Sequence, residues 1–375
     1  MSRKRTLGLL VLVFLTACTP ALPPTQEATD VPAPTSEPTV EAPSPTLSPT
    51  ETLAPPPTPA EAEPTAAVIP DRPQTFGANE FTTDFSKTTV PFSEINTLLR
   101  RDSIPAINNP DFITIEEADA WLGEFEPVVF LKIGADARAY PLQILTWHEI
   151  VNDLVDGVPV VLTFCPLCNT AIAFDRFFVV LILDFGTTGR LRFSNLIMYD
   201  RQTNTWWQQA DGQAIVGEHA GKALNFLPAA IIGWTDFKEA HPDGRVLSRN
   251  TGFPRDYGLN PYAGYDDVRR SPFAYDGPES PGQLLAMARV LTVELNEEAV
   301  AYPYDILSEV QVIHDEVGGE QVIVFWTPGT NSALDQSAIA IGRDVGSANA
   351  FSPEVDGEGL TFRAEGELIL DDQTD

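Results

Sequence analysis

An ungapped internal repeat constrains the fold of this chain more than any other feature. The motif Ala137-Arg-Ala-Tyr-Pro141 returns 162 positions later as Ala299-Val-Ala-Tyr-Pro303. Identical residues recur at the same spacing, with Ile144, Leu145, Asp153, Val155, Gly157, Val160, Pro166, Asn169 and Ala171 matching Ile306, Leu307, Asp315, Val317, Gly319, Val322, Pro328, Asn331 and Ala333. Self-similarity at a fixed period indicates structurally equivalent units. We therefore expect an internally duplicated domain.

Each unit has the pattern of a small, strand-rich αβ element. In the first copy, Tyr140-Pro141 opens a short helix, because proline is tolerated in the first helical turn. An Asp156-Gly157 turn joins two extended segments. The strands predicted for this copy are 128–133, 150–155, 158–164 and 171–174. The fold class we predict is α+β with β predominating, built from two pseudo-symmetric αβ units with a strand-rich insert between them.

Two further helices are expected outside the repeated segments. The sequence Thr114-Ile-Glu-Glu117 has the spacing of a capping box and predicts a helix that continues through Leu122. Between the units, residues 177–275 have the pattern of strands and turns, with a short helix near 235–240.

The first 18 residues have the order of a secretion signal. A basic segment, Ser2-Arg-Lys-Arg5, precedes an apolar stretch at 7–14, and Leu15-Thr-Ala-Cys18 is a small-residue cleavage site that ends in cysteine. This tetrapeptide resembles a lipobox, which implies that Cys18 becomes a lipid-bearing N-terminus. An ordinary signal peptide or a short membrane helix is the alternative, but the apolar stretch is too short to span a bilayer. We expect an extracytoplasmic protein of the cell envelope, bound to the membrane through this lipid.

Composition divides the rest of the chain into a tether and a globular part. Residues 19–75 are dominated by Pro, Thr, Ala and Glu, which predicts a disordered spacer of about 3.1 Å per residue when extended. The globular domain is expected at 76–375, with repeat unit one at about 127–176, the insert at 177–285, repeat unit two at about 289–338 and C-terminal strands at 339–375. The chain carries 53 acidic against 23 basic residues. This acidic balance disfavours nucleic acid as a partner.

Two cysteines remain once Cys18 is assigned to the lipid. Cys165 and Cys168 flank Pro166-Leu167 where an apolar segment leads into a loop, so both sulfurs can point to the same side of a turn. Such a pair can bind a metal, cycle between dithiol and disulfide, or form a passive disulfide. A bridge that closes so short a loop contributes little entropic stabilisation, which disfavours the last use.

The leading hypothesis from the residues is a soft-metal site. Two thiolates and an imidazole suit copper or zinc, and His148 precedes the hairpin that carries the cysteines. Met198 is a candidate thioether ligand, although core packing is the commoner role of such a residue. In the redox alternative, His148 lowers the pKa of the attacking thiol. A third hypothesis is a stalked, non-catalytic binding or adhesion module, and the sequence leaves open whether the protein is an enzyme.

The two copies differ at the residues that carry chemistry. Thr327 and Thr330 replace Cys165 and Cys168, and Val310 replaces His148. A residue needed only to shape the loop should occur in both copies, so these side chains indicate a task specific to the first unit. A polar, turn-rich stretch provides a candidate pocket lining: Arg255, Asp256, Tyr257, Asn260 and Tyr262.

These motifs together resemble a bacterial family known as domain of unknown function 3179. The resemblance rests on Arg138-Ala-Tyr-Pro141, Trp147-His-Glu-Ile-Val-Asn-Asp153, Cys165-Pro-Leu-Cys-Asn169, Ser194-Asn-Leu-Ile-Met-Tyr-Asp-Arg201 and Arg255-Asp-Tyr-Gly258. It implies an exported or lipid-anchored protein with a characteristic Cys-Pro-x-Cys loop. Trp147, Glu149 and Asn169 are carried over as motif positions around the cysteines. The apolar stretch at 177–183 replaces the polar turn usual in the family.

Overall fold

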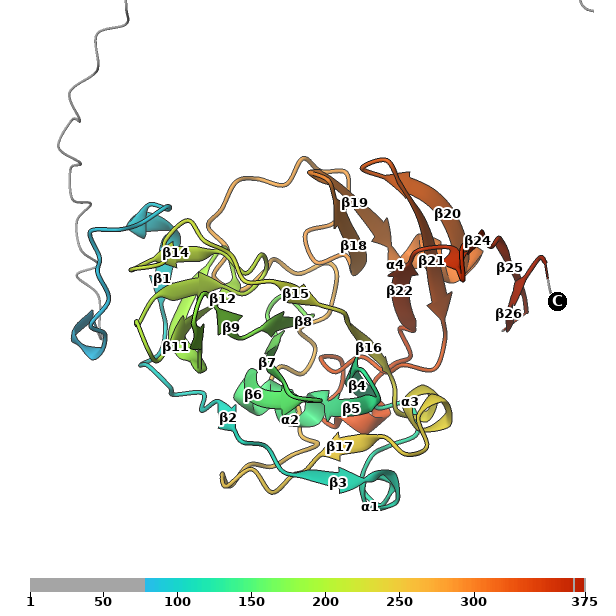
Figure 1. Ribbon diagram of the computed structural model, residues 1–375, viewed down its shortest axis with the longest axis horizontal. Coiled ribbons are helices and arrows are strands. Elements are labelled where there is room, and N and C mark those ends of the chain that lie inside the picture. Colours follow the sequence, from blue (N-terminus) through green and yellow to red (C-terminus); the bar gives the residue numbers. More distant parts are fainter. Residues whose placement is uncertain (1–77, 367, 374–375) are drawn as a thin grey trace, which may run out of the picture. The chain divides into compact units, whose positions relative to one another are not determined.

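The computed structural model describes residues 78–366 and 368–373 (Figure 1). The predicted signal peptide, Cys18 and the predicted tether lie outside the described residues. Within the described part, strands far outnumber helices, as expected for a β-predominant α+β fold. No helix among these residues is long and apolar enough to cross a membrane.

Three five-stranded sheets carry the first unit and its surroundings in the described part of the chain. The first sheet has the order β1 (Ile95–Thr97), β11 (Phe185–Arg192), β12 (Asn195–Asp200), β13 (Trp206–Gln208), β14 (Ala214–Val216). The second has the order β15 (Phe226–Leu227), β8 (Thr170–Asp175), β7 (Val158–Cys165), β6 (Ile150–Val155), β2 (Ile107–Asn108). The third has the order β16 (Ala229–Gly233), β4 (Pro127–Ile133), β5 (Asp136–Pro141), β17 (Arg245–Leu247), β3 (Phe112–Thr114).

The remaining elements are smaller. The described helices are α1 (Ile115–Asp119), α2 (Leu142–His148), α3 (Trp234–Ala240) and α4 (Tyr304–Val310), and 3₁₀ turns lie at Ala78–Glu80, Phe92–Glu94 and Ile339–Ile341. Hairpins pair β9 (Phe177–Phe178) with β10 (Leu181–Ile182), β18 (Val290–Leu295) with β19 (Glu298–Pro303), β23 (Glu354–Val355) with β24 (Glu358–Gly359), and β25 (Phe362–Glu365) with β26 (Leu368–Asp371). A three-stranded sheet has the order β20 (Val312–Val317), β21 (Glu320–Thr327), β22 (Ser347–Phe351).

The same succession of elements occurs twice along the chain. A β4–β5 hairpin, α2 and a β6–β7 hairpin are followed later by a β18–β19 hairpin, α4 and a β20–β21 hairpin. From β5 to β7 and from β19 to β21, the bounds of every element agree with the 162-residue spacing of the sequence repeat. A buried tyrosine donates to an aspartate in each succession, Tyr140 to Asp153 at 2.6 Å and Tyr302 to Asp315 at 2.9 Å.

The core of the first succession lies between its two sheets and α2. Val129, Leu131, Tyr140, Ile144, Leu145, Val151, Leu162 and Phe164 are fully or almost fully buried in one cluster. Helix α2 contacts β4, β5 and β7, and the carbonyl of Glu149, directly after the helix, accepts from the Phe164 amide next to Cys165. The helix therefore places the residues after it beside the cysteine loop.

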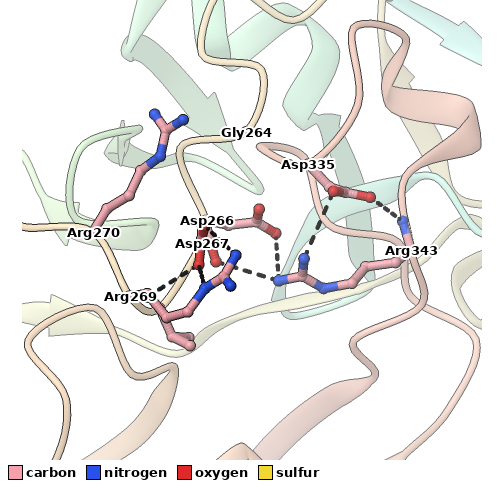
Figure 2. Close-up of a pocket in the computed structure, with 8 residues that line it drawn as sticks. Gly264, Asp266, Asp267, Arg269, Arg270, Asp335 and Arg343 are labelled. Carbon is pink, nitrogen blue, oxygen red and sulfur yellow. Dashed lines mark hydrogen bonds and ion pairs between the residues drawn. The ribbon is translucent and has the colours of Figure 1, made fainter.

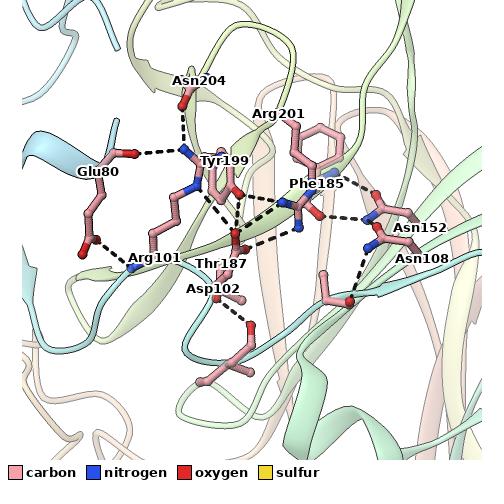
Figure 3. A network of polar contacts seen from close by, with 12 residues as sticks. Glu80, Arg101, Asp102, Asn108, Asn152, Phe185, Thr187, Tyr199, Arg201 and Asn204 are labelled. Carbon is pink, nitrogen blue, oxygen red and sulfur yellow. Dashed lines mark hydrogen bonds and ion pairs between the residues drawn. The ribbon is translucent and has the colours of Figure 1, made fainter. Parts of the chain in front are cut away.

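A polar network fastens the segment around residues 80–108 to the β11–β12 hairpin (Figure 3). The Arg101 guanidinium donates to the Glu80 carbonyl and to the Asn204 side chain, each at 3.0 Å. The Tyr199 hydroxyl donates to the Asp102 carboxylate at 2.6 Å. This network steadies the hairpin whose turn, at Phe193 and Ser194, contacts the cysteines.

Most of the expected elements occur, with one clear departure. The capping box forms as predicted, because Thr114 accepts from the Glu117 amide and Glu117 accepts from the Thr114 amide. The prediction that its helix continues through Leu122 is wrong, since α1 ends at Asp119. The amides of Trp121 and Leu122 both donate to the Ala118 carbonyl, which tightens the backbone into a turn. In the insert, the strands end at Leu247, and residues 248–289 form turns, bends and irregular segments, with an isolated bridge from Leu259 to Ala338.

Candidate dithiol site

The cysteine loop is a tight connection between two neighbouring strands. Strand β7 ends at Cys165, and β8 begins at Thr170 as its antiparallel partner. The Cys168 amide donates to the Cys165 carbonyl at 3.1 Å, and the Asn169 amide donates to the Pro166 carbonyl at 3.2 Å. Asn169 takes a left-handed conformation with φ of 50°, which asparagine tolerates better than most residues. The turn directs both cysteine side chains to one side.

The two sulfur atoms lie 2.8 Å apart, with the Cys165 thiol donating toward Cys168. Both cysteines are free thiols; Cys165 is buried and Cys168 is partly exposed. The hairpin turn between β11 and β12 completes their surroundings. The Asn195 amide group donates to the Cys168 sulfur at 3.2 Å, and the Ser194 carbonyl oxygen lies 3.5 Å from the same sulfur.

The surroundings give the two thiols opposite acidities. The hydrogen bond from the Cys165 thiol lowers the pKa of Cys168, and the donors Asn195 and Leu196 lower it further. Burial raises the pKa of Cys165 well above its ordinary value, and the neighbouring negative charges of Cys168 and Glu149 add to this rise. Thiolate character therefore concentrates on the more exposed sulfur, Cys168.

Glu149 is a buried carboxylic acid beside this pair. It follows α2 directly in a left-handed conformation with φ of 58°, where its amide donates to Leu145 and its carbonyl accepts from Phe164. Burial raises its pKa to about 8, and the negative charge of Cys168 contributes to this rise. The hydroxyl of Tyr262 hydrogen-bonds to the Glu149 carboxyl group, and the pKa of Tyr262 is raised, chiefly by burial. A carboxyl group with a pKa of about 8 thus interacts through its charge with both thiols.

The structure directs His148 away from the cysteines. Its Nδ1 lies 2.7 Å from the Pro105 carbonyl oxygen, and its Nε2 lies 2.7 Å from the Tyr257 hydroxyl. Burial lowers its pKa, so the neutral imidazole with one donor and one acceptor is favoured. Both ring nitrogens are engaged, and the expected convergence of His148 with the thiols does not occur.

Met198 and Trp147 have different surroundings. Met198 is fully buried on β12 in the hydrophobic cluster that also contains Cys165, and it pairs with Trp207 across the sheet. Its environment is that of a core side chain. Trp147 donates from its indole nitrogen to the Leu259 carbonyl at 3.2 Å. It therefore fastens the 249–262 stretch to α2.

The residues expected to line a pocket separate into different roles. Tyr257 contacts His148, and Tyr262 contacts Glu149, so both cover the end of α2. Asn260 instead binds the Gln336 carbonyl at 2.9 Å. The Arg255 guanidinium lies 6.0 Å from the Trp147 ring. The backbone carbonyl of Asp256 accepts from the Leu259 amide, closing a turn.

Arg289, which is not among the expected site residues, supports the cysteine loop from a distant part of the chain. With its carboxamide oxygen facing the guanidinium, Asn169 accepts from Nη1 and Nη2 of Arg289 at 3.0 and 2.8 Å. Arg289 also donates to Ser332 at 3.4 Å, and Ser332 donates to Asp266. Sequence pattern carries no signal for this contact, because Arg289 lies 120 positions after Asn169.

A hollow of about 400 Å³ lies beyond Asp266 (Figure 2). Its charged side chains neutralise one another: Arg343 pairs with Asp266 at 2.9 Å, and Arg269 pairs with Asp267 at 2.8 Å. Among residues 78–366 and 368–373, no three or more His, Cys, Asp or Glu side chains are grouped so that they could hold a metal ion. The two sulfurs, 2.8 Å apart, and the raised pKa of Glu149 therefore mark the candidate site.

Fold and site together define a β-predominant α+β protein with an asymmetric cysteine pair beside a buried acid. A family model described as "Protein of unknown function (DUF3179)" matches residues 101–373, and the chain belongs to this family. The match extends through the second succession of elements, which confirms the resemblance drawn from the motifs. Comparison with curated proteins and with solved structures gave no match.

Proposed function

We propose that this protein carries out thiol–disulfide exchange through Cys168 and Cys165, with Glu149 as the proton-transfer group. The observation that carries the proposal is the arrangement of two free sulfurs 2.8 Å apart, one exposed and one buried, beside a carboxyl group whose pKa is about 8. A disulfide needs the sulfurs at about 2.05 Å, so bond formation requires only a small displacement.

The first half of the exchange belongs to Cys168. Its thiolate attacks one sulfur of a substrate disulfide; a new sulfur–sulfur bond forms, the substrate bond breaks, and the departing sulfur leaves as a thiolate that takes a proton from water. A mixed disulfide between Cys168 and the substrate results. The lowered pKa of Cys168 supports this role, because only the thiolate is nucleophilic.

The second half belongs to Cys165 and Glu149. The ionised Glu149 carboxylate accepts the Cys165 proton, the Cys165 sulfur bonds to Cys168, and the second substrate sulfur departs and receives the proton. Two electrons have passed to the substrate, which is now a dithiol, and the protein holds a disulfide. A partner dithiol restores the pair by the same steps in reverse. Its first thiol loses a proton to Glu149 and bonds to Cys168, the Cys165–Cys168 bond breaks, and Glu149 passes the proton to Cys165. The second partner sulfur then displaces Cys168 as a thiolate and closes the partner's own disulfide. A pKa near the working pH suits both directions.

The geometry gives less support to the soft-metal hypothesis, which stays a prediction. Two sulfurs bound to one zinc ion at about 2.3 Å each, in tetrahedral geometry, lie on the order of 3.7 Å apart. The two sulfurs are 2.8 Å apart, and both ring nitrogens of His148 are hydrogen-bonded, to Pro105 and to Tyr257. Copper or zinc bound to this pair would need ligands that the present arrangement does not bring together.

A stopped-flow reaction of the reduced chain carrying Cys18→Ser, which leaves Cys165 and Cys168 as its thiols, with 5,5′-dithiobis(2-nitrobenzoate) tests the proposal. One coloured thiolate is released when Cys168 attacks and a second when Cys165 closes the disulfide. Glu149→Gln should slow the second release by roughly 10²-fold, the typical contribution of a positioned base, and leave the first almost unchanged. Gln311→Glu is the matched control, since it alters the equivalent position of the second succession.

Two measurements can overturn the proposal. A reduction potential of the pair below about −300 mV would identify an inert structural bridge. Mass spectrometry that finds one copper or zinc ion per reduced chain, lost in Cys165→Thr and Cys168→Thr, would replace exchange with metal binding. These substitutions introduce the residues found at Thr327 and Thr330, so they suit the local fold.

We also propose the setting in which this exchange takes place. The lipobox-like Leu15-Thr-Ala-Cys18 supports export and lipid attachment at Cys18, which places the domain outside the cytoplasm, on a membrane. The expected result is that the processed, lipid-bearing chain partitions into detergent, whereas residues 18–375 carrying Cys18→Ser stay in the water phase. Water-phase recovery of both forms would refute the anchor.

The repeated element order supports a duplication as the origin of the domain. Element bounds, the Tyr–Asp hydrogen bonds and the left-handed residues after α2 and α4 agree between the copies. In this proposal the first copy carries the reactive residues, Cys165, Cys168 and Glu149, and the second copy retains the backbone arrangement without them.

A further inference from the structure

The β9–β10 hairpin presents an uninterrupted apolar surface to solvent. Residues 177–183 read Phe-Phe-Val-Val-Leu-Ile-Leu and include no polar side chain. At the tip, Val179 and Val180 are 73% and 78% exposed. Phe177, Leu181 and Ile182 are exposed along the arms, where Ile182 pairs with Phe177 across the hairpin. Water thus contacts a continuous group of five large apolar side chains.

The base of this hairpin is firmly held. Leu183 is fully buried in the cluster that contains Cys165, and Phe178 packs edge-on against Trp207 with ring centres 5.2 Å apart. Arg176 donates to the carbonyls of Val160, Leu183 and Asp153. The apolar tip is therefore a fixed projection of the fold.

The turn at the tip has an unfavourable residue. Val179 has φ of 59°, in the left-handed region that a β-branched side chain strongly disfavours. Glycine, asparagine or aspartate normally occupies such a position in a two-residue hairpin turn. Local folding does not explain valine here, and strain of this kind concentrates at functional positions.

We propose that this hairpin tip inserts into the apolar outer layer of a lipid bilayer. The side chains favour lipid over a protein partner, because protein interfaces concentrate their binding energy in Trp, Tyr and Arg, and Leu and Val are under-represented there. Insertion into a bilayer is driven by the burial of apolar area. The exposed side chains that provide this area are Phe177, Val179, Val180, Leu181 and Ile182.

The sequence before residue 78 gives the reason to expect a bilayer near this hairpin. The proposed lipid on Cys18 lies at the far end of the 19–75 spacer, so the inference rests on the proposed function for the nearness of a membrane. A tethered domain meets the surface at high effective concentration, so a weak apolar contact suffices. With 53 acidic and 23 basic residues, the chain is repelled by anionic lipid, and a zwitterionic surface is the expected target.

Vesicle co-sedimentation of residues 18–375 carrying Cys18→Ser, which lack both the lipid and the apolar segment at 7–14, tests the hairpin apart from the anchor. The probe is a vesicle of pure phosphatidylcholine. Val179→Gly with Val180→Ser replaces the strained apolar turn with a common hairpin turn, and Ile341→Ser with Leu285→Ser removes two other exposed apolar side chains as a control. We expect the turn variant to bind at least about tenfold less than its parent, from the apolar area lost, and the control to bind as the parent does.

A second readout uses Val180→Trp in the same Cys18→Ser chain. Its indole emission should shift to shorter wavelength on addition of phosphatidylcholine vesicles. Absence of vesicle binding by the Cys18→Ser parent, equal binding of the turn variant, or an unshifted indole overturns the proposal, as does concentration-dependent dimerisation that the turn variant abolishes. None of these outcomes bears on the dithiol, and detergent partition of the unmodified chain tests the anchor separately.

Discussion

Glu149 and Gln311 occupy the same position in the two successions of elements. Each follows its helix in a left-handed conformation, with φ of 58° and 60°, and each donates its amide to a leucine carbonyl four residues earlier at 2.7 Å. The carbonyls also act alike, accepting from Phe164 at 2.7 Å and from Trp326 at 2.8 Å. The backbone therefore does not require a carboxyl group here. The acid is present only where the cysteines are.

Glu149→Gln should change how stability depends on pH. Because the pKa of Glu149 rises from 4.5 to about 8 on folding, the folded state binds the extra proton between these values. The free energy of unfolding therefore falls as pH rises through this window, by up to about 1.4 kcal/mol per pH unit. Chemical denaturation of the reduced proteins at pH 5 and pH 9 measures this effect. The free energy of unfolding of the parent should fall more between the two pH values than that of the variant. Parallel curves for the two proteins would contradict the prediction.

Cys165→Ala should make Cys168 less acidic. The hydrogen bond from the Cys165 thiol is the largest cause of the lowered pKa of Cys168, and alanine cannot donate it. Alkylation by iodoacetamide, followed across pH, should show the midpoint of Cys168 moving to higher pH and its rate at pH 7 falling several-fold. An unchanged midpoint would mean that Asn195 and Leu196 alone set the acidity.

Oxidation of the pair should lower the pKa of Glu149. Burial is the first cause of the raised pKa and the charge of Cys168 is the second; a disulfide removes only the second. The pKa should therefore fall below about 8 but stay above 4.5. The carbonyl stretch of the protonated acid, assigned with Glu149→Gln and titrated by infrared spectroscopy in both redox states, measures this shift. Identical titrations would show that no thiolate charge reaches Glu149.

Tyr140→Phe should destabilise the protein more than Tyr302→Phe. The Tyr140 hydroxyl donates at 2.6 Å to Asp153, which is buried, so its loss should cost about 1.5–3 kcal/mol. The equivalent bond from Tyr302 to Asp315 is longer, at 2.9 Å, and Asp315 is partly exposed, so water can replace the hydroxyl. Urea denaturation of both variants gives the comparison; equal losses would contradict it.

Sequence pattern predicted the strands around the cysteines well, because these strands follow local polarity and turn chemistry. The cysteine spacing and the family motif also pointed to Cys165, Cys168 and Glu149, whose role stays a proposal. The orientation of His148 could not be predicted, since it depends on Pro105 and on Tyr257, which lies 109 residues away. The same is true of Ser194 and Asn195, whose approach to Cys168 results from the packing of one sheet against another.

The bond between Asn169 and Arg289 sets a lower limit on how far this protein can be shortened. A chain that stops before Arg289 retains both cysteines, Glu149 and the strands that carry them. It lacks the guanidinium that hydrogen-bonds to Asn169 in the cysteine loop. Such a fragment would hold its sulfurs less firmly. Exchange of the C-terminal third between two relatives should therefore alter the reactivity of the cysteines, although the cysteines and Glu149 lie outside the exchanged segment.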